Sequence, residues 1–123
     1  MGGIFIATNM GAARVVHLPN PTWGNHGAIF ADSGLKTQSY RYFLPATKGL
    51  DFEGMCADLT QVEEGAVVLL HSCAHNPTGV DLTPAQVPPC VRVPWIVCAD
   101  DTVLQPWCHG SCVLVTLIMD HVY

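Results

Sequence analysis

Charged side chains are scarce in this 123-residue chain. They make up 12% of the residues, which is about half of the share usual for soluble domains. Lysine and arginine together number only 5, and the formal net charge is -5. So few cations leave no basic surface that could neutralise phosphates. We therefore expect a protein that binds neither nucleic acid nor an anionic membrane surface.

Long hydrophobic runs are also missing. The longest candidate, residues 113–119, is far shorter than the roughly 20 residues of a transmembrane helix. The N-terminal string MGGIFIATNM lacks both the basic start of a signal peptide and the arginines and serines of a transit peptide. We therefore expect a cytoplasmic location, with a mitochondrial one left open, and no disulfide framework from the 6 cysteines.

Apolar residues, in contrast, are plentiful and make up 50% of the chain. The length fits one domain at most. A chain of this size buries only about two-thirds of its surface on folding. The apolar content therefore favours a partner chain, or a segment that belongs to a larger domain.

The most informative stretch is residues 67–79, VVLLHSCAHNPTG. Its first four residues, Val67–Leu70, are apolar and partly β-branched, which predicts a parallel strand buried on both faces. The string NPTG that ends the stretch forms turns readily. Ligands of open α/β sheets bind at the carboxyl ends of the strands. The sequence therefore places a ligand site near this loop.

Expected strands and helices alternate before this loop. Pro19 and Pro21 are expected to end the first strand, Gly34 suits the position after a helix, and Asp51 suits a helix N-cap. The expected strands are residues 14–18, 37–43 and 67–70, and the expected helices are residues 28–31 and 51–59. This alternation predicts a parallel α/β fold.

Four strings in this part of the chain resemble the aspartate aminotransferase family of pyridoxal-phosphate (PLP) enzymes. They occur in the family's order and at its spacing, and the resemblance covers residues 4–86. It implies an incomplete segment of the large α/β domain of PLP-dependent transferases. The strings are PNPTWGNH at 19–26, YRYF at 40–43, LDFEGM at 50–55 and LLHSCAHNPTGVD at 69–81.

The resemblance implies roles for five residues. Trp23 matches the tryptophan that stacks on the PLP ring. Asn76 matches the asparagine that hydrogen-bonds the cofactor's phenolic oxygen and a substrate carboxylate. His26 matches a histidine near the acid that pairs with the pyridine nitrogen, and His71 and His75 match positions beside the cofactor pocket. The implied reaction is PLP-dependent transfer of an amino group between L-aspartate and 2-oxoglutarate, and the family's enzymes are homodimers.

Other groups that the family needs have no match in this chain. The family's cofactor-binding lysine lies downstream of the NPTG loop, whereas Lys36 and Lys48 lie upstream of it. Asp100 and Asp101 follow an apolar run, but the tyrosine context of the family's aspartate is absent. We therefore predict no catalytic residue in this chain and no transaminase activity from it alone.

The sequence changes in character after Gln86. Residues 83–86 have the form of a helix start with a capping box, but Pro88 and Pro89 follow at once and leave no room for a long helix. Strand propensity returns only at 95–99 and 113–119. We therefore predict a partial PLP-binding domain at 1–86 and an unmatched tail at 87–123, which has a changed reading frame or folds poorly.

A function of a different class stays open. Alternate strand positions place His71, Cys73 and His75 on one face, and histidine and cysteine are zinc ligands. The string CHGSC at 108–112 could add ligands, although the spacing matches no CxxC site. The alternative is therefore a non-enzymatic Cys/His metal-binding or interaction module. A nucleophilic Cys73 beside a histidine is a weaker alternative.

Overall fold

We describe the protein from a computed structural model that defines residues 15–62, 67–71, 74–83 and 85–86 and the backbone of two further strands. Two helices and seven strands lie within these residues. They are β1 (Val15–Asn20), α2 (Asn25–Asp32), β2 (Lys36–Arg41), β3 (Phe43–Leu44), β4 (Gly49–Leu50), α3 (Phe52–Leu59), β5 (Val67–Leu70), β6 (Trp95–Cys98) and β7 (Val113–Thr116).

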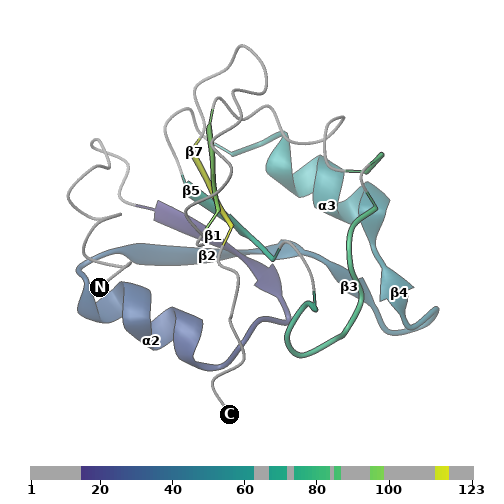
Figure 1. The fold of residues 1–123 in the computed structure, drawn as a ribbon, viewed down its shortest axis with the longest axis horizontal. Coiled ribbons are helices and arrows are strands. Elements are labelled where there is room, and N and C mark those ends of the chain that lie inside the picture. The colour runs from purple at the N-terminus through teal and green to yellow at the C-terminus, as the bar shows by residue number, and fades with distance from the viewer. Residues whose placement is uncertain are drawn as a thin grey trace.

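Five of these strands form one sheet in the order β2-β1-β5-β7-β6 (Figure 1). Neighbouring strands in this sheet run parallel throughout. Within it β1 lies between two partners, since Val16 is in register with Thr37 of β2 and with Val67 of β5. The parallel sheet with its helices confirms the predicted α/β fold class.

Strand β5 is buried on both faces, as its apolar run predicts. Its two odd-numbered side chains join a core cluster around Phe30 of α2, and its two even-numbered side chains join a second cluster around Met55 of α3. Successive side chains of a strand point to opposite faces of the sheet. The two helices therefore cover opposite faces, which is also how they lie in Figure 1.

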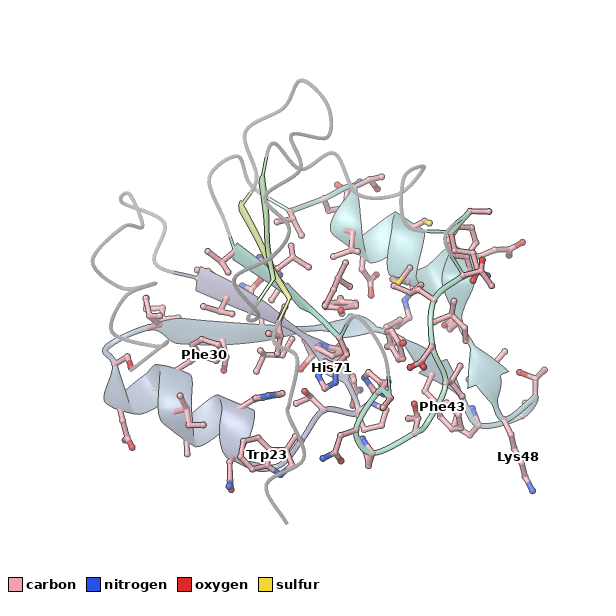
Figure 2. All side chains as sticks on the ribbon, in the orientation of Figure 1. Trp23, Phe30, Phe43, Lys48 and His71 are labelled. Carbon is pink, nitrogen blue, oxygen red and sulfur yellow. The ribbon has the colours of Figure 1, made fainter. Side chains whose placement is uncertain are left out.

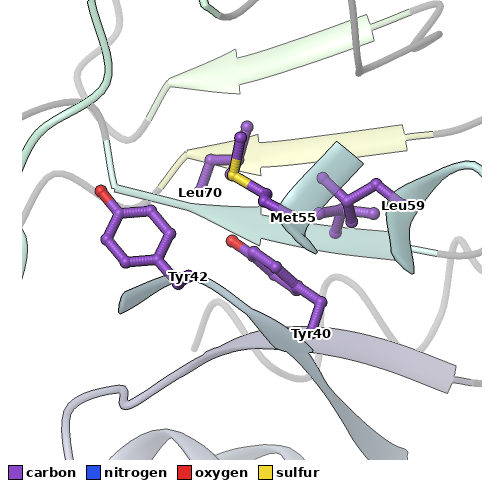
Figure 3. Packing of buried hydrophobic residues seen from close by; sticks show 6 residues of the cluster. Tyr40, Tyr42, Met55, Leu59 and Leu70 are labelled. Atoms are coloured by element: carbon purple, nitrogen blue, oxygen red, sulfur yellow. The ribbon is translucent and has the colours of Figure 1, made fainter. Parts of the chain in front are cut away.

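The core cluster that packs against α3 contains two tyrosines, one in β2 and one just after it (Figure 3). Tyr40 is 2% exposed, and its hydroxyl donates a hydrogen bond of 2.7 Å to the carbonyl oxygen of Leu69. Tyr42 is 1% exposed and donates a bond of 2.6 Å to the carbonyl oxygen of Val80. Both hydroxyls thus find backbone acceptors, which removes the cost of burying them unpaired.

Two predicted helix ends are confirmed. The Asp51 carboxylate accepts a hydrogen bond of 2.9 Å from the backbone N–H of Gly54, so Asp51 caps α3. Gly34 follows the C-cap of α2 with a φ of 75°, a conformation that glycine adopts without strain. Helix α2 begins at Asn25, three residues before the predicted start, because the chain already turns at Trp23, whose carbonyl accepts from His26 N–H at 3.0 Å.

The expected end of the first strand at Pro19 is wrong. Strand β1 runs on through Pro19 to Asn20, in register with Tyr40 and Arg41 of β2. Proline cannot donate a ladder hydrogen bond. It is tolerated here because pairing of β1 with β5 covers only Val16 and His17, so Pro19 faces a neighbouring strand on one side only.

The expected single strand at 37–43 is also wrong in part. The chain leaves the large sheet after Arg41, and Phe43–Leu44 pairs antiparallel with Gly49–Leu50 as a separate hairpin. The residue between the two strands is Tyr42, whose buried ring belongs to the core under α3. Anchoring of this ring redirects the chain, which alternation of residue types does not reveal.

The predicted strands at 95–99 and 113–119 appear as β6 and β7, which pair parallel with each other and through β7 with β5. At the predicted capping box, the Gln86 side-chain oxygen accepts from Thr83 N–H at 2.9 Å, while residues 85–86 form a turn. The division of the chain at Gln86 stays a prediction. Among the helices of the described residues, none is long and apolar enough to cross a membrane.

The burial of β5 leads to a first prediction. Leu69 is 0% exposed, so we expect Leu69→Ala to lower the free energy of unfolding by about 3 kcal/mol, because a cavity replaces packed atoms. Ile29 of α2 is 42% exposed, and Ile29→Ala should change the free energy by no more than about 0.5 kcal/mol. Urea denaturation of the two variants measures both values, and equal losses would contradict the assignment of β5 to the core.

Candidate functional site

All five residues that the sequence singles out follow the carboxyl ends of two neighbouring strands. Trp23 and His26 come after β1, and His71, His75 and Asn76 come after β5. The two strands are adjacent and parallel, so both loops leave the same edge of the sheet. Figure 2 shows Trp23 and His71 in the same part of the molecule. This is the edge at which open α/β sheets bind ligands.

A continuous series of aromatic rings connects the two loops. The ring centroids of Trp23 and His26 are 5.3 Å apart, and those of His26 and His71 are 5.4 Å apart, both with edge-to-face geometry. The series continues from His71 to His75 at 4.5 Å and from His75 to Tyr42 at 4.0 Å, where the rings are stacked. We call these five rings the ring series. It fixes the positions of the β1 and β5 loops relative to each other.

The three histidines of the ring series are deeply buried, with exposed fractions of 1% for His26, 4% for His71 and 1% for His75. Threonine hydroxyls hold two of them. The distance from Thr22 Oγ1 to His26 Nδ1 is 2.7 Å, and that from Thr78 Oγ1 to His75 Nδ1 is also 2.7 Å. Thr22 lies just before α2, which carries His26, and Thr78 lies in the same loop as His75, so the orientation of each ring is set locally.

The protonation of His71 follows from its backbone partner. The N–H of Asn76 donates to His71 Nδ1 at 3.3 Å, so this nitrogen is an acceptor and carries no proton. A neutral imidazole then carries its proton on Nε2. The Nε2 atoms of His26, His71 and His75 are all buried and have no hydrogen-bond partner within the described residues. Such unpaired buried atoms are costly, which indicates a site that a further polar group completes.

Burial keeps these imidazoles neutral. Desolvation, with a smaller contribution from the neighbouring His71, lowers the pKa of His26 to about 4. Desolvation followed by repulsion from His71 lowers the pKa of His75 to about 4, against an opposing effect of Asp81. The pKa of His71 is lowered as well, again mainly by desolvation. The ring series therefore carries no positive charge at neutral pH.

Tyr42 is a site residue that sequence reasoning missed. Its ring stacks on His75 with an angle of 19° between the planes, and its hydroxyl bonds to Val80 on the far side of the loop. Burial, followed by the effect of Asp81, raises the pKa of Tyr42 to about 12, so the phenol stays protonated. The alternation of Tyr40 and Tyr42 predicts a shared face but gives no sign that one tyrosine reaches the loop.

Asp81 is a second missed residue. Its carboxylate accepts hydrogen bonds from the backbone N–H groups of Ala74, at 2.9 Å, and His75, at 2.8 Å. An aspartate five residues after Asn76 looks in the sequence like an ordinary surface charge. Only the folded loop brings it back to the start of the turn.

Asn76 and Trp23 retain unused binding capacity. Both side chains are partly exposed, and the Asn76 amide makes no hydrogen bond to the described residues, since only its backbone N–H is engaged. An aromatic face and an unpaired amide on two loops at the same sheet edge fit a planar heteroaromatic ligand that carries a hydrogen-bonding oxygen. The three unpaired Nε2 atoms belong to the ring series that links these loops.

The two lysines lie away from this edge. Lys36 is exposed at the first position of β2, the end of the sheet opposite to the site. Lys48 is exposed in the β3–β4 hairpin, and Figure 2 shows its side chain pointing outward at the right-hand edge of the molecule, apart from Trp23. Neither lysine belongs to the edge of the sheet that carries Trp23.

The structure gives no support to a metal centre in the part it describes. Among those residues no three His, Cys, Asp or Glu side chains are placed to hold a metal ion. His71 and His75 instead belong to the ring series. The other candidate ligands, Cys73 and the string at 108–112, lie outside the described residues.

The fold and the candidate site together define a class, an α/β protein whose candidate ligand site lies at the carboxyl edge of a parallel sheet. The sequence profile "Aminotransferase class I and II" matches residues 2–94. The chain therefore belongs to the family of class I and II aminotransferases, whose members are PLP-dependent. This confirms the family that the four strings indicate.

Similar proteins include aspartate aminotransferases from several kingdoms. The chain is 54% identical over 83 residues to aspartate aminotransferase 1 of Medicago sativa, covering 68% of this chain and 20% of that protein. It is 49% identical over 81 residues to the mitochondrial aspartate aminotransferase of Gallus gallus, covering 66% and 19%. The match thus spans about a fifth of the length of these relatives.

Solved structures show the same likeness. The cytoplasmic aspartate aminotransferase of Saccharomyces cerevisiae matches with a TM-score of 0.64 and 44% identity over 69% of this chain and 20% of that one. An aromatic amino acid aminotransferase of Burkholderia cenocepacia matches with a TM-score of 0.65 and 40% identity over 69% and 21%. The fold is therefore a segment of the large domain of PLP-dependent transferases.

The neutral buried histidines lead to a prediction on acid stability. The folded-state pKa of His26 and of His75 is about 4, below the ordinary value of 6.5, so protonation favours the unfolded chain. The stabilisation is complete above pH 6.5 and is lost as the pH falls through about 4. We expect a loss of about 3 kcal/mol in the free energy of unfolding for each of the two rings over this range, measured by urea denaturation at stepped pH.

A neutral variant provides the control. His26→Gln removes one of the two titrating rings, so its free energy of unfolding should depend on pH less steeply over the same range. Carboxylates that titrate in this range are shared by both proteins and cancel in the comparison. An unchanged slope in the variant would contradict the assignment of a depressed pKa to His26.

Proposed function

We propose that the carboxyl edge of β1 and β5 is one part of the PLP site of an enzyme of the aspartate aminotransferase type. The observation that supports the proposal most directly is the ring series, which brings the Trp23 loop and the Asn76 loop together at one edge of the sheet. Two residues that are 53 positions apart in the chain (76 − 23) thereby face one site.

Trp23 would bind the flat pyridine ring by stacking. An indole offers a large apolar face, and offset stacking of aromatic rings contributes about 1 kcal/mol beyond the area that is buried. The edge-to-face contact with His26 fixes the plane of the indole. The role of His26 is therefore to orient the stacking residue.

Asn76 would bind polar oxygens with its side-chain amide. Its N–H₂ group can donate to the phenolic oxygen of the cofactor and to a carboxylate of the substrate. A hydrogen bond to a charged oxygen is worth about 1.5–3 kcal/mol. The role of His71 is to hold the backbone of Asn76 through Nδ1, and that of His75 is to support the loop through Thr78.

When bound, PLP supplies an electron sink that allows an amino group to pass to a 2-oxo acid. The neutral histidines keep the site behind Asn76 free of positive charge, while their unpaired Nε2 atoms can meet a further polar group of the complete site. The substrates proposed for the intact enzyme are L-aspartate and 2-oxoglutarate, and the homodimer of the family is proposed with them. The relatives include both cytoplasmic and mitochondrial proteins, and we propose a cytoplasmic location.

Binding of PLP by the 123-residue chain tests this proposal. Titration calorimetry should show that Trp23→Ala and Asn76→Ala each weaken binding by about tenfold, because each removes one contact with the cofactor. Trp23→Phe should bind with intermediate affinity, since a smaller ring still stacks. Ile29→Ala changes an exposed residue outside the ring series and serves as the control. Equal affinities of all four variants would refute the proposed site.

The positions of the lysines give a further prediction. Because Lys36 and Lys48 lie away from the site, this chain should form no borohydride-stable PLP adduct at either lysine beyond the level of a denatured sample. Transaminase activity with aspartate and 2-oxoglutarate should be absent for the same reason. Mass spectrometry of the reduced, digested protein identifies any adduct. The prediction would be overturned by a stoichiometric adduct at Lys36 or Lys48 that forms in the folded chain and not in the denatured sample.

A further inference from the structure

The loop that carries Asn76 has a backbone that needs external support. Ala74 has a φ of 51°, which is uncommon for a residue with a side chain, and Gly79 has a φ of 67°. One backbone–backbone hydrogen bond within the loop joins Gly79 N–H to the carbonyl of His75 at 2.7 Å, and the Thr78 hydroxyl contacts His75 Nδ1 and the N–H of Val80. These contacts all lie after Ala74, so they do not fix its left-handed backbone.

Three consecutive backbone N–H groups at the start of this loop are instead held by side chains. Those of Ala74 and His75 donate to the two carboxylate oxygens of Asp81, at 2.9 and 2.8 Å. That of Asn76 donates to His71 at 3.3 Å. The shorter pair of bonds goes to the oxygens of a carboxylate, and hydrogen bonds to carboxylates are the stronger ones.

The carboxylate of Asp81 has no competing partner in the described residues. The ion pair found there joins Arg41 to Asp58 and leaves Asp81 without a cation. Asp81 is exposed, so it contributes little to the core. The two hydrogen bonds that Asp81 accepts link the end of the loop to Ala74 and His75, the two residues before Asn76.

We propose that Asp81 is a positioning residue for Asn76. Its carboxylate fixes residues 74 and 75, and thereby the direction in which the Asn76 side-chain amide points. Without it the loop would relax at Ala74, and the amide would lose its alignment with the phenolic oxygen of PLP. The proposal deepens the function proposed above and rests on it.

Asp51 provides a matched control for this proposal. It is also an aspartate that accepts a backbone hydrogen bond, from Gly54 at 2.9 Å, but it caps α3 and lies outside the Asn76 loop. Asp51→Ala therefore removes the same chemical group and destabilises the fold without touching the loop. Asp81→Asn keeps the size and one acceptor oxygen and serves if Asp81→Ala does not fold.

The experiment compares the affinity for PLP with that for 3-deoxypyridoxal 5′-phosphate, which lacks the phenolic oxygen. The unaltered chain and Asp51→Ala should both prefer PLP by about tenfold, the value of one hydrogen bond to a charged oxygen. In Asp81→Ala the preference should fall to about twofold or less, as in Asn76→Ala. A merely destabilised protein would weaken binding of both ligands equally. An Asp81→Ala protein that keeps the full preference overturns the proposal.

Amide hydrogen exchange separates this proposal from the proposed function. Exchange at Ala74, His75 and Asn76 should be at least about tenfold faster in Asp81→Ala than in Asp51→Ala. If the unaltered chain does not bind PLP, the proposed function fails, while the exchange rates still decide whether Asp81 holds the loop. Equal exchange rates in the two variants would refute the positioning role directly.

Discussion

The burial of β5 on both faces is the constraint on which the rest of the structure depends. Four consecutive apolar side chains cannot all be covered by one layer, so α2 and α3 must lie on opposite sides of the sheet. In this arrangement β1 lies beside β5, and β2 lies on the other side of β1. The arrangement also brings the ends of β1 and β5 to one edge, where the site lies. The hydrophobic effect thus determines where the polar loops lie.

The site itself is held by packing of neutral rings and by short polar contacts within each loop. Burial makes the imidazoles uncharged, which allows three of them to lie next to one another without strong repulsion. Thr22 and Thr78 orient the rings, and Tyr42 closes the series. Three buried nitrogens stay unpaired within the described residues. A segment that matches about a fifth of its relatives' length fits such an unfinished polar site.

Much of the fold could be predicted from local signals. Local residue types were enough to predict the buried strand β5, the helix cap at Asp51 and the left-handed turn at Gly34. The predictions fail where distant contacts decide. Pro19 stays within β1 because the pairing of β1 with β5 covers only Val16 and His17, and Tyr42 leaves β2 because its ring is needed in the core under α3.

The sequence by itself determined the family and the strand-loop pattern, and it singled out Trp23 and Asn76 as the residues of the proposed site. These features depend on residue types at fixed spacing along the chain, which can be read directly from the sequence. Only the tertiary structure decided which residues support them. Tyr42 and Asp81 join the site because the sheet and the turn bring distant backbone groups within hydrogen-bond distance. The depressed pKa values likewise come from burial, which no single residue type specifies.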